Sequence, residues 1–590
     1  MKALLVALNA KYIHSNPAVY SLKAYAEKQF DCDGDLRSFQ KSDIEIAEYT
    51  INQPFLGILT DIYRRKADVI FFSCYIWNIR ESEQLAEEIG KIMPDIDIWF
   101  GGPEVSYNSK DILEKFNNIK GVIKGEGEET FYQILKAYEK KERNFDDNLI
   151  LIKGIVFRKN TDEIEETLNR EYMDLSLVPF LYNGADGYGE KMETFENRII
   201  YYESSRGCPF RCSYCLSSID KKLRFRNIDM VKAELGYFLK NNVPQVKFID
   251  RTFNCNHERA AEIWRFLKEN DNGITNFHFE IAGDILSSYE IKLIKTMRAG
   301  QIQLEIGVQS TNGETLREIN RPMDFEKLSE TVNLIKQGNN VHIHLDLIAG
   351  LPFEGYKRFS DSFNDVFLLR PHQLQLGFLK VLKGSPMKEN SLRYGLKFTS
   401  SPPYEVLETK WISYDEIIKL KGIEDMVEIY YNSGQFSNTI EVLLKFFETP
   451  FQLFESLASW HEENNLEMIN VSRKGRYENL IKFISSQDIK VHGQIEDMII
   501  IDYYMRENAK NRPDFFRKSE VERSFEKKFY GEEAKNHRYL KGKEFNTDDS
   551  RVLRKLTHME KIGDKYYLFN YEKRNPMDNN AEVMEIKKYW

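Results

Sequence analysis

The stretch Arg198-Ile-Ile-Tyr-Tyr-Glu-Ser-Ser-Arg-Gly-Cys-Pro-Phe-Arg-Cys-Ser-Tyr-Cys215 joins a short apolar strand to a dense group of cysteines. Its three thiols, Cys208, Cys212 and Cys215, are separated by three and then by two residues. Three thiolates at this spacing can bind three irons of a cubic [4Fe–4S] cluster and leave the fourth iron without a protein ligand. A zinc site would need a fourth cysteine or histidine nearby, whereas the next cysteine, Cys255, lies 40 residues farther on. The spacing therefore favours a cluster over structural zinc.

Outward from the cysteines, residues 196–395 repeat a strand-and-helix unit. Candidate strands begin 26 to 47 residues apart, at Arg198, Gln245, Asn276, Ile302, His342 and Gln375. Such spacing suits βα units, in which a helix returns the chain to a neighbouring parallel strand. Six units predict a partial (β/α)6 barrel of the TIM type, whose chemistry lies at the carboxyl ends of its strands. The cysteines follow the first strand at that end.

Residues 1–140 also alternate short apolar strands with amphipathic helices. The candidate strands are Lys2–Leu8, Asp68–Cys74, Asp97–Phe100 and Gly121–Ile123. This alternation predicts a Rossmann-like α/β domain with a parallel sheet. Glycine turns follow two of the strands, at Gly101-Gly102-Pro103 and Gly125-Glu126-Gly127. Because ligands bind at the carboxyl edge of an open parallel sheet, both turns are candidate ligand contacts.

The other regions carry fewer signals. Residues 141–195 contain a strand near 150–157 and a turn-rich loop over 179–189, which together indicate a linker. Residues 396–590, which begin near the Ser400–Pro403 run, are mostly helical and charged and carry no recognisable chemistry. They indicate a helical C-terminal domain of unknown role.

The composition limits the class of protein. At 590 residues the chain exceeds the roughly 250–300 that one core supports, so several domains are expected. A net charge of −9 makes nucleic acid an unlikely partner. No apolar run approaches the roughly 20 residues of a membrane span, and the first residues do not form a signal-peptide pattern. We therefore expect a cytoplasmic protein.

The cysteine motif resembles the fingerprint of the radical S-adenosylmethionine (SAM) superfamily, CxxxCxΦC, with Tyr214 as the aromatic residue. The lead-in Tyr202-Glu-Ser-Ser-Arg-Gly207 is similar to that of its cobalamin-binding branch. The resemblance implies that SAM binds the open iron and is cleaved to a 5′-deoxyadenosyl radical after one electron enters. An electron donor such as flavodoxin or ferredoxin would then be a partner. In such enzymes the protein positions and shields the cofactors that break the bond.

The resemblance also implies residues that contact SAM. Asp250 and Thr252 follow the second barrel strand, where the family binds the amino group of SAM. Glu280 places a carboxylate near the end of the third strand. These three side chains are candidate SAM contacts on the resemblance alone.

Gln309, Arg321 and Asp346 fall where a subgroup resembling coproporphyrinogen dehydrogenases contacts the carboxylate and ribose of SAM. Arginine suits a carboxylate because it can donate two parallel hydrogen bonds. The alternative for Arg321 and Asp346 is an ion pair at the barrel rim. Side chains alternate along a strand, so His342 and His344 should share a face with Asp346. His344 lies nearer the catalytic end and is the candidate proton donor or substrate ligand, against the alternative of a hydrogen-bonded core residue.

In front of such a barrel, residues 1–140 resemble the cobalamin-binding domain of class B radical SAM enzymes. The candidate contact positions are Ser73, Trp77, Gly101, Gly102 and Gly125. Glycine lets the backbone approach a corrin edge or nucleotide tail, and Trp77 would lie against the corrin or pack within the domain. The DxHxxG motif of many cobalamin proteins is absent, and His14 is the only histidine in this region. The resemblance therefore implies cobalamin bound without a histidine ligand, or a vestigial domain that binds none.

The leading functional hypothesis is a cobalamin-dependent radical SAM methyltransferase, which would pass a methyl group from cobalamin to a substrate radical. One alternative is a rearrangement or ring-forming enzyme with the same cofactors, and another is an iron–sulfur sensor or electron carrier. A tRNA methylthiotransferase is disfavoured because that family needs three cysteines in its N-terminal domain, and only Cys32 and Cys74 precede Cys208. No motif specifies the substrate.

Overall fold

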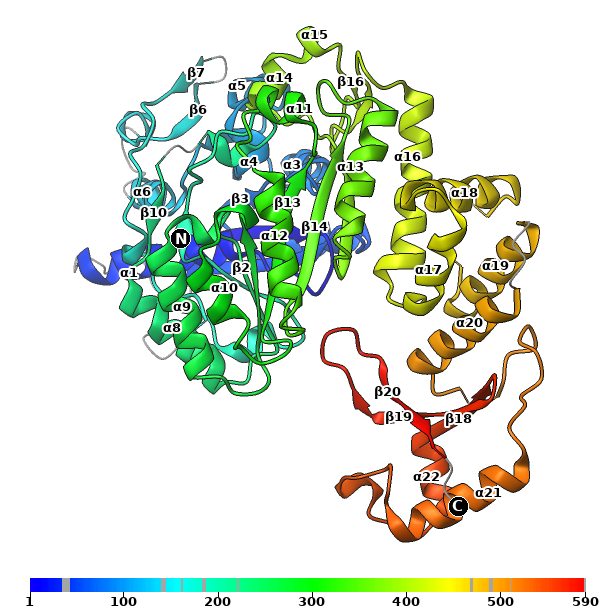
Figure 1. The fold of residues 1–590 in the computed structure, drawn as a ribbon. Coiled ribbons are helices and arrows are strands. Elements are labelled where there is room, and N and C mark those ends of the chain that lie inside the picture. The colour runs from blue at the N-terminus through cyan, green and yellow to red at the C-terminus, as the bar shows by residue number, and fades with distance from the viewer. Residues whose placement is uncertain are drawn as a thin grey trace. The chain divides into compact units, whose positions relative to one another are not determined.

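The protein is described by a computed structural model that covers most of the chain (Figure 1). The described residues are 1–33, 43–139, 145–160, 163–182, 187–219, 222–466, 471–487, 492–509 and 511–587. Part of the turn-rich loop predicted over 179–189 lies outside them, at 183–186. The chain packs into two compact units. The first comprises 1–304, 314–327 and 378–410, and the second comprises 305–313, 328–377 and 411–590.

The first unit begins with a seven-stranded sheet of order β2-β1-β3-β4-β5-β6-β7. Its strands are β1 (Ala3–Asn9), β2 (Ile44–Thr50), β3 (Val69–Ser73), β4 (Asp97–Gly101), β5 (Ile119–Ile123), β6 (Ile155–Asn160) and β7 (Glu163–Glu166). The first five strands are parallel, and β6 and β7 extend the sheet with antiparallel pairing. The predicted Rossmann-like sheet is confirmed. The edge strand β2 was not predicted, because Glu45 and Glu48 interrupt its apolar residues.

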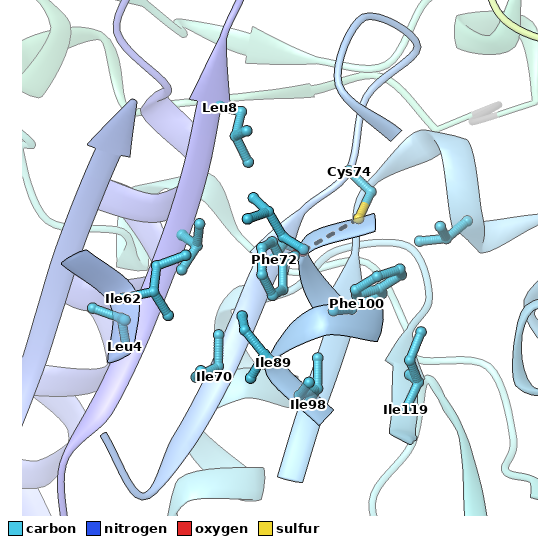
Figure 2. Packing of buried hydrophobic residues seen from close by; sticks show 14 of the residues in the cluster. Leu4, Leu8, Ile62, Ile70, Phe72, Cys74, Ile89, Ile98, Phe100 and Ile119 are labelled. Carbon is cyan, nitrogen blue, oxygen red and sulfur yellow. Dashed lines mark hydrogen bonds between the residues drawn. The ribbon is translucent and has the colours of Figure 1, made fainter. Parts of the chain in front are cut away.

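Helices cover both faces of this sheet, because its buried strands are apolar on both sides. The helices are α1 (Pro17–Asp33), α2 (Phe55–Arg64), α3 (Ile79–Ile92), α5 (Ser109–Lys115) and α6 (Glu128–Glu139). On one face Phe72 and Phe100 pack with Ile62 of α2 and Ile89 of α3, as Figure 2 shows. On the other face Phe71 meets Phe131 of α6 edge-on, with ring centroids 4.8 Å apart. This alternation is the period of two expected of a strand.

The second large sheet has six strands in the order β15-β14-β13-β12-β11-β8. They are β8 (Ile200–Tyr202), β11 (Gln245–Phe248), β12 (Asn276–Ile281), β13 (Ile302–Gln309), β14 (His342–Ala349) and β15 (Gln373–Phe378). The connecting helices are α8 (Ile228–Lys240), α9 (His257–Glu269), α10 (Ser288–Ile294), α11 (Gly313–Glu318), α12 (Phe325–Lys336) and α13 (Tyr356–Leu368). Neighbouring strands follow one another along the chain, as in the predicted partial barrel. The predicted strand starts agree with the observed ones within two residues.

Two short ribbons accompany the barrel in the first unit. Strand β9 (Ser205–Arg206), directly before the cysteines, pairs antiparallel with β10 (Arg224–Phe225). Strands β16 (Lys397–Phe398) and β17 (Val406–Glu408) form a second ribbon. The Ser400–Pro403 run lies in the connection between them.

The C-terminal part of the second unit is mainly helical, as predicted. Its larger helices are α16 (Tyr414–Val427), α17 (Ser437–Leu443), α18 (Pro450–Glu463), α19 (Arg473–Ser486), α20 (His492–Arg506), α21 (Arg523–Asn536) and α22 (Ser550–Leu556). Helix α18 packs on α13 through Phe451 and Phe363, whose ring centroids lie 5.4 Å apart. None of the helices in the described parts of the chain is long and apolar enough to cross a membrane.

The second unit ends in a three-stranded antiparallel sheet that was not predicted. It consists of β18 (Thr557–Ile562), β19 (Lys565–Arg574) and β20 (Ala581–Ile586), drawn in red in Figure 1. Its core joins Leu568 to Phe529 of α21 and Leu553 of α22. Charged residues alternate with apolar ones along the outer strands β18 and β20. In a region that is charged throughout, this pattern is not recognisable as a strand.

Candidate cofactor sites

The three cysteines lie on the loop that follows β9 in the first unit. Cys212 is buried, Cys208 and Cys215 are partly buried, and all three are free thiols. Two backbone hydrogen bonds hold the middle of the loop at Ser213. Ser213 N donates to Ile319 O at 2.9 Å, and Met387 N donates to Ser213 O at 2.9 Å. Among the described residues, no three His, Cys, Asp or Glu side chains converge on a single ion.

Hydrogen-bonding groups surround two of the thiols. The Thr252 hydroxyl lies 3.6 Å from Cys208 Sγ, so this predicted residue is beside the loop. Arg321 Nη1 donates to Cys212 Sγ at 3.7 Å. Burial lowers the pKa of Arg321, but Tyr214 and Cys212 outweigh burial and the net pKa is raised. A guanidinium that stays charged here stabilises negative sulfur, which suits a loop of cluster thiolates.

Asp250 is fully buried and holds the segment that leads into the loop. Its carboxylate accepts hydrogen bonds from Ser204 N at 2.8 Å and Ser204 Oγ at 2.7 Å, and from the Ser205 hydroxyl. Burial raises the pKa of Asp250 to about 6, against the effect of the two serines. The contacts of this predicted SAM residue are therefore with the lead-in itself. Glu280, near the end of β12, is partly buried.

The second unit carries the predicted residues of β13 and β14. His344 Nε2 lies 2.9 Å from Asp346 Oδ1, which confirms that the two side chains share a face of β14. Gln309 ends β13 with a φ of +72°, in the left-handed region that favours glycine. Its buried Oε1 has no hydrogen-bond partner among the described residues. A strained residue with an unsatisfied polar atom is a candidate ligand contact.

A cavity of about 860 Å³ lies in the first unit, at the carboxyl edge of the N-terminal sheet. The predicted residues Ser73, Gly101, Gly102 and Gly125 line it, and so do Tyr201, Glu203 and Arg206 at the start of the barrel. Trp77 does not line the cavity. Its indole stacks on Tyr75, with ring centroids 4.4 Å apart, and Tyr75 is the aromatic residue that forms part of the wall.

The two glycine turns bring bare backbone to the cavity. Gly102 has a φ of +114°, and a Cβ there would lie 2.4 Å from the carbonyl oxygen of Cys74. Gly125 has a φ of +71°, and a Cβ there would meet no atom within 4 Å. Both positions therefore need glycine, the first for packing and the second for its conformation beside open space. This cradle fits the close approach of a large planar ligand such as a corrin.

No histidine belongs to the described lining of the cavity. His14 is not a lining residue, and its Nδ1 lies 2.6 Å from the hydroxyl of Tyr201, which is one. Burial, followed by Lys11 and Lys247, lowers the pKa of His14, so this ring is neutral at pH 7.

Sequence reasoning missed the ion pairs made by glutamates of the N-terminal domain. Arg198 pairs with Glu48 within β2, and Lys383 Nζ lies 2.7 Å from Glu104 after β4. Arg206 Nη2 lies 2.8 Å from Glu128 after β5. One signal was available: in the sequence a glutamate follows each glycine turn within two residues. These glutamates could not be recognised as ion-pair partners, because the basic residues they contact lie far away in the sequence.

Three family models match the chain: "B12 binding domain" over 3–135, "Radical SAM superfamily" over 202–366 and "Protein of unknown function (DUF4080)" over 392–584. With the fold and the cysteine loop, these matches show that the chain contains a radical SAM domain. The chain carries a B12-binding domain in front of the radical SAM domain and a DUF4080 domain behind it.

Curated relatives resemble the first two domains. The cobalamin-dependent radical SAM methyltransferase TokK of Streptomyces tokunonensis is 23% identical over 387 residues, which cover 62% of this chain and 55% of TokK. The 2-(S-pantetheinyl)-carbapenam-3-carboxylate methyltransferase of Streptantibioticus cattleyicolor is 24% identical over 454 residues, covering 70% of this chain and 64% of that enzyme. The chain thus spans less than two thirds of the length of either relative.

A solved structure shares the fold. The radical SAM methyltransferase TsrM of Kitasatospora setae, determined with tryptophan and a SAM analogue, aligns with a TM-score of 0.53 and 15% identity. The alignment covers 68% of this chain and 78% of TsrM. At this identity the likeness concerns the fold alone.

Proposed function

We propose that the chain is a cobalamin-dependent radical SAM methyltransferase with one [4Fe–4S] cluster on Cys208, Cys212 and Cys215. The observation that carries the proposal is the cavity of the first unit. The same cavity is lined by the glycine turns of the B12-binding domain and by the segment that leads into the cysteine loop. The activity named for TokK and for the carbapenam methyltransferase supports the same assignment.

The residues of the chain would bind and orient the cofactors. Gly101, Gly102 and Gly125 would let the backbone approach the corrinoid, and Tyr75 would contact it through an aromatic face. Arg321 would bind the carboxylate of SAM while it stabilises Cys212. When bound, cobalamin would supply a methyl carrier, and the cluster with SAM would supply a 5′-deoxyadenosyl radical.

The remaining SAM contacts rest on the resemblance. Gln309 and Asp346 would contact the carboxylate and ribose of SAM, Thr252 would belong to the motif that binds its amino group, and Glu280 would be a further contact of SAM. His344 would exchange a proton with the substrate, with its ring oriented by the contact to Asp346. Single substitutions at these positions, each with a SAM titration and an iron assay, test them individually.

The proposal is tested by the products of SAM in the reconstituted protein. The chain should bind about four irons and one hydroxocobalamin. With a reductant and methyl-labelled SAM, it should form both 5′-deoxyadenosine and S-adenosylhomocysteine, the latter only when cobalamin is bound. S-adenosylhomocysteine marks removal of the methyl group, and 5′-deoxyadenosine marks radical cleavage.

Other outcomes would indicate the alternatives. Formation of 5′-deoxyadenosine alone, with cobalamin bound, would favour a rearrangement or ring-forming enzyme. A stable cluster that neither binds nor cleaves SAM would favour an iron–sulfur sensor or electron carrier. Absence of hydroxocobalamin binding would favour a vestigial domain.

The setting and boundaries belong to the same proposal. Cobalamin would bind without a histidine ligand, as the contact of His14 with Tyr201 supports. The reductant would be a small donor such as flavodoxin or ferredoxin, and the compartment would be the cytoplasm. The proposed domains are 1–140, 196–395 and 396–590, joined by a linker over 141–195.

A further inference from the structure

Arg206 occupies an unusual position, because it lies two residues before Cys208 and also lines the cavity. Its guanidinium contacts three carboxylates. Nη2 lies 2.8 Å from Glu128 Oε1 and 2.8 Å from Glu203 Oε2, and Nη1 lies 3.3 Å from Glu126 Oε1. Two of these carboxylates, Glu126 and Glu128, belong to the B12-binding domain. One side chain thus joins the wall of the cavity to the segment that enters the cysteine loop.

The network around Arg206 is built on two short elements. On one side, Glu126 and Glu128 belong to the turn that begins at Gly125 and leads into α6, and this turn lines the cavity. On the other side, Arg206 of β9 is paired across the ribbon with Arg224 of β10, which also contacts Glu126. The carboxylate of Glu126 therefore lies between two arginines that would otherwise repel each other. Ser21 Oγ donates a further hydrogen bond to Glu128 Oε1 at 3.0 Å.

We propose that Arg206 is a positioning residue that couples corrinoid binding in the cavity to the geometry of the cysteine loop. The inference rests on the proposed function, since it needs a corrinoid in the cavity and a cluster on the loop. A ligand that orders the Gly125–Glu128 turn also orders Arg206, and through the backbone Cys208. A cluster that orders Cys208 orders the same turn from the other side. Each event therefore makes the ordering of the other less costly.

Such coupling has a measurable consequence. The affinity for hydroxocobalamin should be at least about fivefold higher in the cluster-loaded protein than in the cluster-free protein. By thermodynamic linkage, hydroxocobalamin should shift cluster assembly in the same direction. The bound corrinoid should also change the EPR spectrum of the reduced cluster. None of these readouts requires catalytic turnover.

The test compares this affinity ratio among variants by equilibrium dialysis of hydroxocobalamin. The double variant Arg206→Met/Glu128→Gln removes the arginine together with its most buried partner, because removing Arg206 alone would leave the buried carboxylate of Glu128 unpaired. Its ratio should fall to about one, while each form still binds hydroxocobalamin. Arg206→Lys is the milder variant. It retains the charge but cannot contact two carboxylates through a planar fork, so its ratio should fall part of the way.

A matched control removes another ion pair of the first unit. Arg298 Nε lies 2.8 Å from Asp271 Oδ2, and neither residue lines the cavity. Arg298→Met/Asp271→Asn should therefore keep the wild-type ratio. Equal affinities in the two forms of the wild-type protein would overturn the inference, and so would an unchanged ratio in both Arg206 variants. Failure of the wild-type protein to bind hydroxocobalamin or iron would instead contradict the proposed function, and with it the coupling.

Discussion

The segment Glu203–Arg206 is anchored in two opposite ways at its two ends. Toward the barrel, the buried carboxylate of Asp250 accepts hydrogen bonds from the neutral donors of Ser204 and Ser205. Toward the B12-binding domain, the equally buried carboxylate of Glu128 faces the guanidinium of Arg206. Burial raises the pKa of both carboxyl groups. For Asp250 this effect prevails and the pKa is about 6, whereas for Glu128 the pairing with Arg206 outweighs burial and the net pKa is lowered.

The difference shows that the partner, rather than burial, decides how readily an anchor loses its charge. Asp250 is held by neutral donors, and because its folded pKa is about 6 it becomes neutral already in mild acid. The ionic anchor holds its charge only while both partners are present, because a single buried charge is strongly unfavourable. The barrel side of the lead-in is therefore suited to rigid support, and the domain side is suited to transmit a change in the cavity.

The largest expected effect is on iron content, which should distinguish the cysteines that bind the cluster from the residues that anchor the loop. Cys208→Ala/Cys212→Ala/Cys215→Ala should bind no cluster iron after anaerobic reconstitution, against about four irons in the wild type. Asp250→Asn and Arg206→Met should retain most of the iron, because anchors position the loop without binding iron. Cys255→Ser is the matched control, since it removes a partly buried thiol outside the motif. A full cluster in the triple variant would refute the assignment.

The second prediction tests the two anchors by the pH dependence of thermal stability in the cluster-free protein. The folded pKa of Asp250, about 6, exceeds the ordinary 3.8. Its ionisation therefore opposes folding as the pH rises from about 4 to 6, by roughly 3 kcal/mol when complete. Asp250→Asn should gain stability relative to the wild type at pH 7, and the gain should vanish near pH 4.

Glu128→Gln should show the opposite sign. Because the folded pKa of Glu128 is lowered below 4.5, its stabilisation is fully present above pH 4.5 and is lost as the pH falls through the folded value. The variant should melt below the wild type at pH 7, and the difference should shrink in acid. Melting curves for both variants from pH 7 down to about pH 3 measure this contrast, because the effect of Glu128 is lost only below pH 4.5. Slopes of the same sign would contradict the distinction between an anchor held by neutral donors and an ionic anchor.

A third prediction extends the comparison to a cation beside the thiols. Arg321→Ala should lower SAM affinity by about tenfold to a hundredfold, because a hydrogen bond to a charged group contributes about 1.5–3 kcal/mol. Its iron content should stay near the wild-type value. Arg317→Ala removes an exposed arginine from α11, four residues before Arg321, and should change neither property. A lower melting temperature with unchanged SAM affinity would make Arg321 a structural residue at the barrel rim.

The smallest expected effect concerns the turn that carries the ionic anchor. Gly125→Ala forces alanine into a φ of +71° and should lower stability by about 1 kcal/mol. It should also weaken hydroxocobalamin binding by up to about fivefold. Gly273→Ala imposes the same strain at a φ of +75°, away from the cavity and with equally open space around it. It should destabilise the protein similarly and leave hydroxocobalamin affinity unchanged. Equal affinities in the two variants would show that Gly125 does not contact the corrinoid.

Much of this molecule could be predicted from local pattern. The starts of the barrel strands, the parallel strands of the N-terminal sheet and the placement of the cysteines after a strand were all readable from short-range periodicity. The strand β2 was missed because Glu45 and Glu48 interrupt its apolar residues, and β18 and β20 because charged residues alternate with apolar ones. The strand β19 between them was also missed, although no charged residue interrupts it over 566–571. Trp77 was predicted either to lie against the corrin or to pack within the domain. Its indole stacks on Tyr75, which lines the cavity, and the local sequence does not show which of the two rings faces the cavity.

By itself, the sequence determined the chemistry of the loop, because the spacing of three thiols along one short segment is a covalent property of the chain. It also determined which turns expose bare backbone, since glycine alone tolerates those conformations. Only the tertiary structure decided how these parts are held. Glu128 meets Arg206, and Glu104 meets Lys383, across segments far apart in the chain. Such pairs form because a buried charge requires an opposite charge wherever the fold provides one, and no local pattern records that choice.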